Sequence, residues 1–246
     1  MAYSEITDRF IIPKDELIIW RYMDYDKFEY MIKKSALYFA RADEFGKYDE
    51  AVISFADKEF LRKGREQTGN KNWESDYQNE ITFYEATKTK TYLSCWIHSH
   101  NETRYMWNNF TKTNEAIAIK TKVGNFKKVL IDTNFKEGIQ IGKVEYTDPI
   151  SSTIGIFNIA RLYFRKITDF RNENEIRAII LLHSHEEGPH HLDVSINLND
   201  LIDEIYLNPS SDFSFENKIK NLLKEFNVNK EIFQSKISDY HFTQTI

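Results

Sequence analysis

The chain has 246 residues, of which 41% are hydrophobic, 15% aromatic and 29% charged, and its net charge at pH 7 is −5. Scarce Gly and Pro exclude a collagen-like, linker-rich or disordered chain, and the composition is typical of a globular protein. The acidic balance argues against general affinity for nucleic acid and leaves only a local basic patch for such binding. Cys95 is the only cysteine, which excludes a disulfide framework and a cysteine zinc site.

Targeting signals are not evident in the sequence. Residues 1–9 include Glu5 and Asp8 and lack the apolar centre of a secretory signal peptide. No apolar run is long enough to span a bilayer. We therefore expect a cytoplasmic protein without a membrane partner, for which a nucleotide or another protein is the candidate partner.

The first part of the chain predicts sheet elements separated by a helical insertion. Strands are expected at residues 17–22, 37–45 and 91–98, and a helix at residues 24–34 with Asp24 as its N-cap. Residues 49–90 are charged and helical in period, and residues 64–72 divide them into two helices.

The second part continues this mixture of elements. Further strands are expected at residues 116–121, 139–146, 175–183, 191–196, 202–207 and 232–237, and helices at residues 102–110, 154–165 and 215–226. The chain has neither a steady βαβ period nor a Gly-rich phosphate-binding fingerprint. The sequence therefore predicts one α+β domain over residues 1–246. Its sheet is mixed and mostly antiparallel, with flanking helices and a helical insertion at about 49–90.

A row of charges precedes the most apolar strand. Glu173, Glu175 and Arg177 alternate with other residues, so in an extended chain their side chains would share one face. Buried unpaired charges are costly, so the row is either a satisfied ion-pair ladder or the wall of a site. As a site, it suits a general base or the binding of a ribose.

Two further polar groups lie in predicted strands. Arg21 stands between Trp20 and Tyr22, where a guanidinium beside aromatic rings could bind a phosphate or carboxylate; the alternative is an ion pair with packed rings. Ser94 and Trp96 share a strand face, and Ser94 could orient a ligand or a catalytic carboxylate. No G-x-S-x-G elbow surrounds Ser94, which argues against a nucleophile.

Glu102 and Trp107 belong to a predicted helix. Glu102 lies four residues before Met106 and would share its face, so its carboxylate points toward the packed side or its rim. It is a candidate for binding a substrate together with Trp107. The alternative is a capping acid, because negative charge is favoured near a helix start.

The histidines form two H-x-H pairs, His98 with His100 and His183 with His185. In an extended chain such spacing places both imidazoles on one face, as some metal sites require. Solvated loop histidines are the commoner explanation. A metal-assisted hydrolase or nuclease that uses them is one alternative function.

The ordered motifs W-R-Y, F-A-R-A-D-E-F, L-S-C-W, E-T-R-Y-M-W and K-x-x-x-F-x-x-E-x-E-x-R resemble a bacterial family of unknown function. The resemblance covers about residues 17–209, and the charged insertion at 49–90 departs from its usual pattern. Members occur in phage-defence and abortive-infection-like settings. The resemblance implies a defence role without an established reaction.

A second resemblance is to ADP-ribosyltransferases of the Arg-Ser-Glu type. Arg21, Ser94 and the pair Glu173-x-Glu175 occur in the order of that family, although L-S-C replaces its Ser-Thr-Ser. The resemblance implies NAD as co-substrate, with Arg21 on its phosphate and Ser94 steadying the nicotinamide ribose. It also implies that Glu175 stabilises the oxocarbenium-like transition state and Glu173 positions the acceptor.

The favoured hypothesis is thus a cytoplasmic bacterial defence or toxin-type effector that uses NAD for ADP-ribosyl transfer. Arg21, Ser94, Glu102, Glu175 and Arg177 would build its polar site. Further candidates for binding the substrate or cofactor are the aromatic residues Tyr22, Trp96 and Trp107. The rival hypothesis is a non-enzymatic binding or sensor module in which the same charges are structural ion pairs and the aromatic residues form a partner interface.

Overall fold

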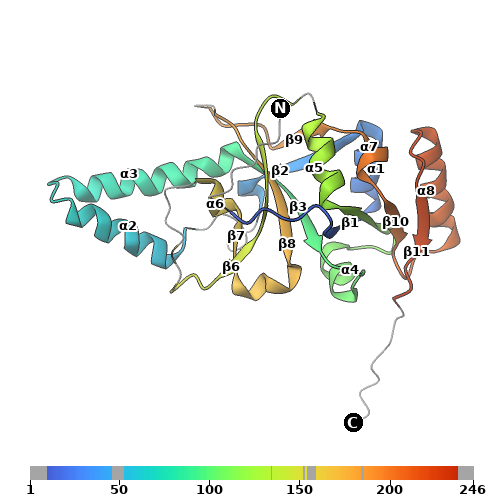
Figure 1. Cartoon of the computed structure of the whole chain (residues 1–246), viewed down its shortest axis with the longest axis horizontal. Helices are drawn as coiled ribbons and strands as arrows, with labels where there is room; N and C mark the ends of the chain where they lie inside the picture. Colours follow the sequence, from blue (N-terminus) through green and yellow to red (C-terminus); the bar gives the residue numbers. More distant parts are fainter. Residues whose placement is uncertain are drawn as a thin grey trace, which may run out of the picture. The chain divides into compact units, whose positions relative to one another are not determined.

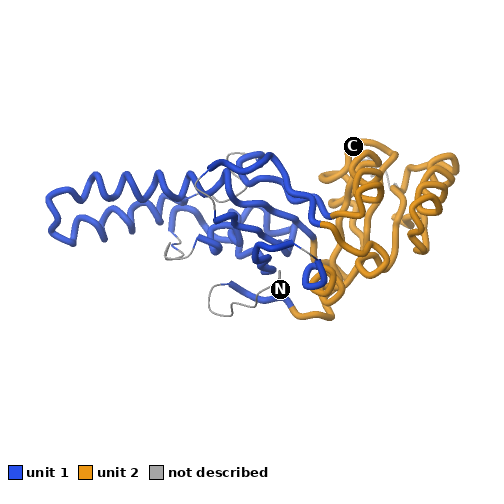
Figure 2. Tube along the Cα trace, turned by 90° about the horizontal axis from the view of Figure 1, so that it is seen from above, with its two compact units in different colours: residues 1–13, 37–96, 130–194 blue, residues 14–36, 97–129, 195–246 orange. Residues whose placement is uncertain are grey.

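The computed structural model describes residues 10–45, 53–133, 135–151, 153, 159–183 and 186–237. The chain divides into two compact units, which Figure 2 distinguishes by colour. Unit 1 comprises Met1–Pro13, Leu37–Trp96 and Leu130–Val194, and unit 2 comprises Lys14–Ala36, Ile97–Val129 and Ser195–Ile246. Each unit is therefore assembled from three separate stretches of sequence.

Unit 1 is built around β-strands. These are β2 (Ala36–Arg41), β3 (Thr91–His98), β5 (Ile139–Lys143), β8 (Glu175–Leu181) and β9 (His191–Ser195) (Figure 1). β3 pairs with β2 and β8, β8 also pairs with β5, and β2 pairs with β9. The β2–β3 and β5–β8 pairs are antiparallel. A separate parallel pair joins β6 (Glu145–Thr147) to β7 (Arg165–Ile167).

The described part of unit 1 also contains four short helices, and two aromatic rings of its core pack closely against Gly142. The helices are η1 (Ala42–Glu44), η2 (Thr87–Lys90), α6 (Ile159–Tyr163) and η3 (Thr168–Glu173). Gly142 lies opposite Arg177 in the β5–β8 pair. A Cβ atom at Gly142 would come within 2.7 Å of the Phe10 ring and 2.9 Å of the Phe164 ring, so a side chain there would displace the two packed aromatics.

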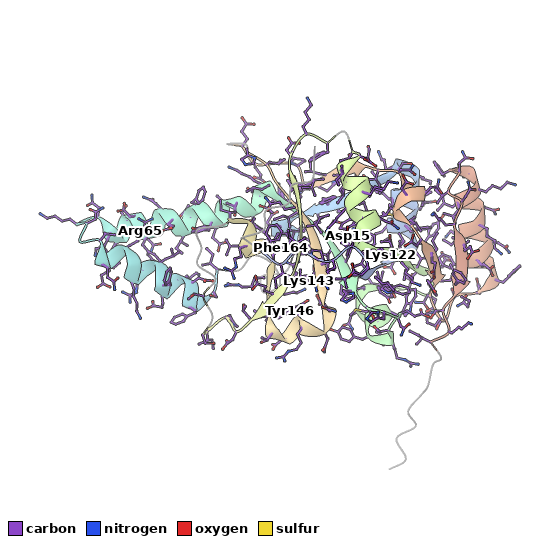
Figure 3. The ribbon with its side chains drawn as sticks, viewed as in Figure 1. Asp15, Arg65, Lys122, Lys143, Tyr146 and Phe164 are labelled. Carbon is purple, nitrogen blue, oxygen red and sulfur yellow. The ribbon has the colours of Figure 1, made fainter. Side chains whose placement is uncertain are left out.

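The expected insertion contains a helical hairpin of α2 (Phe55–Gln67) and α3 (Trp73–Ala86), which projects from the rest of unit 1 (Figures 1 and 2). Ser54 and Asp57 form a capping box at the start of α2. Asp57 is fully buried, and Arg165 pairs with it at 2.6 Å. Along the hairpin, Arg65, labelled in Figure 3, donates to Glu80 on α3.

Unit 2 has its own sheet. Its strands are β1 (Ile18–Asp24), β4 (Ala116–Lys122), β10 (Glu204–Leu207) and β11 (Glu231–Gln234), and the last two residues of β3 pair with β1. β4 pairs antiparallel with β1 and β10, and β11 joins β10 in parallel. The helices are α1 (Tyr25–Lys34), α4 (Arg104–Phe110), α5 (Val123–Ile131), α7 (Leu198–Leu201) and α8 (Phe213–Glu225).

The predicted α+β class with a mostly antiparallel sheet and flanking helices is confirmed. Several details of the prediction are wrong. The strand expected at 139–146 is interrupted between β5 and β6, and the end of the strand expected at 37–45 is the short helix η1. The helices α5 and α7 were not expected, and Arg165 belongs to β7 rather than to a helix. Residues 154–158 of that expected helix lie outside the described residues. Within the described ranges, no helix combines the length and apolarity needed to cross a membrane.

Asp24 also departs from its expected role. It occupies the N-cap position of α1, but its side chain makes no capping hydrogen bond. Its Oδ1 instead accepts from the backbone N–H groups of Lys112 at 2.8 Å and Thr113 at 3.3 Å. A contact 88 residues away in sequence therefore replaces the local one, and it holds the loop that follows α4.

Candidate functional site

Four charged residues of unit 1, Lys166, Glu173, Glu175 and Arg177, form a buried group that we call the carboxylate cluster. Arg177 donates from Nε to Oε1 of Glu175 at 2.7 Å and from Nη2 to Oε2 at 2.9 Å. The guanidinium is 0% exposed and Glu175 is 4% exposed. This two-pronged contact is the strongest geometry available to an arginine and a carboxylate.

Within the carboxylate cluster, Glu173 is linked to Glu175 by Lys166. Glu173 ends η3, and Asn174 follows it with a left-handed φ of 43°, so only Glu175 and Arg177 belong to the strand. The expected extended row of three is therefore wrong at Glu173. Lys166 from β7 nevertheless joins the two acids, because its Nζ lies 2.8 Å from Glu173 Oε2 and 3.8 Å from Glu175 Oε2.

The surroundings displace the pKa values of the two acids in opposite directions. Burial raises the pKa of Glu173, and the neighbouring Glu175 charge adds to that rise, while Lys166 opposes it. Burial also disfavours the charged form of Glu175, but Arg177 and Lys166 outweigh this effect and lower its pKa. Glu175 is therefore held ionised, whereas Glu173 is the acid of the pair that takes up a proton more readily.

Two more groups contact Glu175. Its backbone N–H donates to the Tyr146 hydroxyl at 2.8 Å; Figure 3 labels Tyr146. Burial raises the pKa of this tyrosine, so its phenol stays neutral. The Cys95 thiol forms a hydrogen bond with the Glu175 carboxylate. The sequence pattern indicated only an inert thiol in an apolar strand, because nothing local relates residue 95 to β8.

Ser94 and Trp96 lie together inside unit 1. Both are 0% exposed, and the Trp96 indole Nε1 donates to Ser94 Oγ at 3.3 Å. The shared strand face inferred from their spacing agrees with this contact. Their burial makes this contact part of the core around β3.

The other expected binding residues belong to unit 2. Trp107 Nε1 donates to Glu102 Oε2 at 3.1 Å, and the Tyr22 and Trp107 rings meet edge to face with their centroids 4.9 Å apart. Burial raises the pKa of Tyr22, whose hydroxyl accepts from the Thr103 backbone N–H. The side chain of Thr103, not Glu102, caps α4. The structure thus brings Tyr22, Glu102 and Trp107 into one group.

Arg21 is half-buried on β1, opposite Ile119 of β4. Trp20 and Tyr22 are buried in the aromatic core of unit 2. Because side chains alternate along a strand, Arg21 extends from the opposite face to these two rings. Arg21 belongs to unit 2, and the carboxylate cluster belongs to unit 1.

Of the two histidine pairs, only His98 with His100 lies wholly within the described residues. His98 and His100 have ring centroids 5.7 Å apart, and His98 Nδ1 lies 2.9 Å from the Ile18 carbonyl oxygen. His183 is exposed just beyond β8, and His185 lies outside the described residues. No group of three or more His, Cys, Asp or Glu side chains that could hold a metal ion occurs in the part of the chain that the structure describes.

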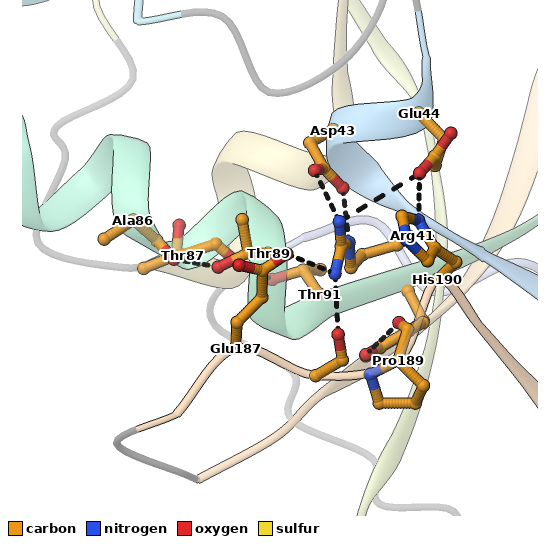
Figure 4. A network of polar contacts seen from close by, with 12 residues as sticks. Arg41, Asp43, Glu44, Ala86, Thr87, Thr89, Thr91, Glu187, Pro189 and His190 are labelled. Atoms are coloured by element: carbon orange, nitrogen blue, oxygen red, sulfur yellow. Dashed lines mark hydrogen bonds and ion pairs between the residues drawn. The ribbon is translucent and has the colours of Figure 1, made fainter.

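A second charged network in unit 1 was not expected from the sequence (Figure 4). Arg41 is 4% exposed and donates to Asp43 from Nε and Nη2, while its Nη1 contacts Glu187 at 2.7 Å and the Gly188 carbonyl oxygen at 2.6 Å. The F-A-R-A-D-E-F motif contains the Arg and Asp of this network. The distant Glu187 is not visible in any local pattern. All three guanidinium nitrogens of Arg41 are thereby engaged: Nε and Nη2 bind Asp43 in η1, and Nη1 joins β2 to Glu187 and Gly188.

Comparisons with known proteins give little further guidance. No protein-family model matches the chain, and no curated protein matches it significantly. Among solved structures, the chain is similar to Thermus sp. 2.9 DarT in complex with NAD+, with 9% identity and a TM-score of 0.42 over 92% of this chain and 98% of that one. The same protein in complex with ADP-ribosylated ssDNA gives 8% identity and a TM-score of 0.42 over 93% and 98%. Similarity this low does not define function.

Proposed function

We propose that this chain is a toxin-type or phage-defence effector enzyme that transfers ADP-ribose from NAD to an acceptor. The observation that carries the proposal is that Lys166 joins Glu173 and Glu175 at 2.8 Å and 3.8 Å, in surroundings that displace their pKa values in opposite directions. Two neighbouring carboxyl groups whose pKa values are pushed apart are the usual sign of a divided acid–base role. The sequence order of Arg21, Ser94 and the acid pair supports the same class of reaction.

The proposed reaction exchanges one bond at the ribose of NAD for another. The bond between ribose C1′ and the nicotinamide nitrogen breaks, and its electron pair leaves with nicotinamide. The ionised Glu175 stabilises the positive charge that develops on the ribose. A hydroxyl or amine of the acceptor then bonds to C1′ and gives its proton to Glu173, whose raised pKa suits it to accept one.

Arg177 and Lys166 are positioning residues in this proposal. Arg177 fixes both oxygens of Glu175 and keeps the carboxylate ionised, and Lys166 holds the two acids beside each other. Ser94 and Trp96 support β3 next to β8. Roles for Arg21, Tyr22, Glu102 and Trp107 in binding NAD remain predictions from the sequence.

The decisive experiment measures nicotinamide released from NAD by the wild-type protein and by Glu175→Gln and Glu173→Gln variants. We expect release by the wild type and a loss of at least 100-fold in Glu175→Gln, as is typical when a transition-state charge loses its partner. Glu59→Gln is the matched control, because Glu59 is a carboxylate of α2 that pairs with Arg62 at the surface. Equal release by wild type and Glu175→Gln would refute the proposal.

A binding measurement accompanies this assay. Isothermal titration with NAD is run on the wild type and on Arg21→Ala. Saturable binding that Arg21→Ala removes supports the predicted phosphate contact. Absence of binding at millimolar NAD counts against an NAD-using enzyme.

The second candidate function is a non-enzymatic binding or sensor module. The burial of the Glu175–Arg177 pair favours it, because a pair at 4% and 0% exposure has little access to a substrate. Glu175→Gln should lower the melting temperature by several degrees under either function, because a buried arginine loses its charge partner. Nicotinamide release by the wild type is therefore the readout that separates the two functions, and its absence favours the binding module.

A further inference from the structure

Unit 2 contains a pocket of about 260 Å³ that none of the expected site residues except Trp107 lines. One wall is α4 and the loop after it, with Arg104 at the start of the helix, Trp107 in its middle and Lys112 in the loop. The other wall is the segment after β10, with Asn208 and Ser210. The two walls are about a hundred positions apart in sequence and meet because β4 pairs with β10.

Hydrogen bonds hold both walls in place. Asp24 accepts from the backbone N–H groups of Lys112 and Thr113, which fixes the loop after α4. Asn208 Oδ1 accepts from the Ser210 backbone N–H at 2.9 Å, and the Asn208 carbonyl oxygen accepts from Gln234 Nε2 at 2.8 Å. The pocket is therefore largely preformed, which reduces the entropy lost when a ligand binds.

The charges on the pocket wall are all positive. Arg104 and Lys112 line it, and within the described residues neither side chain forms an ion pair or a hydrogen bond. No described carboxylate lines the pocket. Two acids accept hydrogen bonds from pocket-lining residues: Asp24 accepts from the Lys112 backbone N–H, and Glu102 accepts from the Trp107 indole N–H.

A neutral donor adds to the two cations. Asn208 is 8% exposed, and its Oδ1 is engaged by Ser210, while its Nδ2 makes no hydrogen bond within the described chain. A guanidinium, an ammonium and an amide N–H group on the wall of one pocket together suit the oxygens of a phosphate. By contrast, Arg177 and Arg41 in unit 1 have their charges matched by carboxylates of the chain.

The geometry points to a binding site for a small phosphorylated molecule of up to mononucleotide size. Pockets for drug-sized ligands run from about 300 to 1,000 Å³, so a pocket of about 260 Å³ holds a phosphate with its ribose rather than a whole dinucleotide. Trp107 provides an apolar surface at the wall. This inference does not depend on the carboxylate cluster being catalytic.

The test titrates the full chain with AMP, adenosine, inorganic pyrophosphate and a single-stranded oligonucleotide by calorimetry at low ionic strength. We expect AMP and pyrophosphate to bind and adenosine to bind much more weakly. Arg104→Gln and Lys112→Gln should each weaken AMP binding roughly tenfold, because each removes one charge-assisted contact. Higher salt should weaken binding further.

Matched controls separate the pocket from general surface charge. Lys220→Gln removes an exposed lysine of α8 that pairs with Glu216, and it should leave AMP binding unchanged. Arg104→Lys retains the charge and should recover part of the affinity. Lys112 is on an exposed loop, so its variant is expected to fold even if Arg104→Gln does not.

Three results would overturn the inference. These are no binding of AMP or pyrophosphate, equal binding by the wild type and both pocket variants, or binding only of a single-stranded oligonucleotide. The last result would replace a small ligand with nucleic acid. None of these outcomes bears on nicotinamide release, so a failure here is distinguishable from a failure of the proposed enzyme activity.

Discussion

The carboxylate cluster of unit 1 and the pocket of unit 2 place positive charge in opposite ways. In the cluster, Arg177 is fully buried and binds both oxygens of Glu175. In the pocket, Arg104 and Lys112 have no charged partner among the described residues. The first arrangement satisfies its charges within the chain, and the second leaves its cations available to a ligand.

The role of an arginine in a candidate site therefore depends on whether the chain itself supplies a partner for its charge. A buried and fully paired guanidinium contributes to the integrity of the fold and controls the pKa of its carboxylate. A cation without a partner is costly to bury and is therefore kept near solvent, where it can meet an anion. Removing the two kinds of cation should have very different consequences.

The largest effect is expected for Arg177→Met. This change leaves Glu175 buried without its main partner, and breaking such a pair costs about 3–5 kcal/mol of unfolding free energy. For a chain of this size the melting temperature should fall by on the order of 10 °C. Thermal unfolding followed by circular dichroism measures it.

The double variant Arg177→Met with Glu175→Leu is the control for this prediction. It removes both charges, and apolar replacement of a buried pair is often close to neutral. We expect it to recover a large part of the lost stability. If the double variant melts as low as the single variant, the loss is due to packing rather than to the uncompensated carboxylate.

Asp57→Ala should have the next largest effect. Asp57 is 0% exposed, pairs with Arg165 and completes the capping box at the start of α2. The loss combines a cap of about 1 kcal/mol with an unpaired arginine, for a total of roughly 2–4 kcal/mol. Chemical denaturation measures this loss of unfolding free energy. A loss below about 1 kcal/mol would show that the buried Asp57–Arg165 pair contributes little to the stability of unit 1.

The pH dependence of stability should separate the two acids. The lowered pKa of Glu175 gives stability that is present above the unfolded value near 4.5 and is lost as pH falls through the folded pKa. The raised pKa of Glu173 has the opposite sign: stability is greatest below 4.5 and declines as pH rises through the folded value.

Melting temperatures of Glu175→Gln, Glu173→Gln and the wild type, measured from pH 3 to 8, test these signs. The deficit of Glu175→Gln relative to wild type should shrink as pH falls below about 4.5. Glu173→Gln should instead improve relative to wild type as pH rises above that value. Parallel curves for the two variants would contradict the assignment.

The smallest effect on stability is expected in the pocket. Lys112→Gln removes an exposed cation without a charged partner, and such changes usually alter unfolding free energy by less than about 0.5 kcal/mol. The melting temperature should therefore stay within about 2 °C of wild type. A loss comparable to that of Arg177→Met would remove the distinction between the two regions.

Sequence periodicity predicts those strands, helices and contacts that depend on residues close together in the sequence. The strand at residues 91–98 was placed correctly because β-branched and aromatic residues concentrate there. The contact between Glu175 and Arg177 also follows from spacing, because residues two apart share a strand face. The existence of two helices in the 49–90 insertion agrees with the charged helical period.

Long-range pairing could not be predicted in this way. Lys166 of β7 lies beside Glu175 of β8 although the two strands belong to different sheets, and the pocket of unit 2 depends on segments far apart in sequence. The helix α5 was missed because Gly124, a poor helix former, stands in its first turn. The single-domain organisation remains a prediction, which the number of unfolding transitions would test.

The interleaving of the two units in the sequence has a consequence for synthesis. Unit 1 uses residues up to Val194, and unit 2 begins at Lys14 and takes up its last stretch only from Ser195 onward. A ribosome makes the chain from its N-terminus, so neither unit can complete its packing while much of the chain is still unmade. The apolar strands that are synthesised early stay unpaired until their partner strands have been made. Because the stretches of the two units alternate, shortening the chain at one end cannot yield either unit by itself.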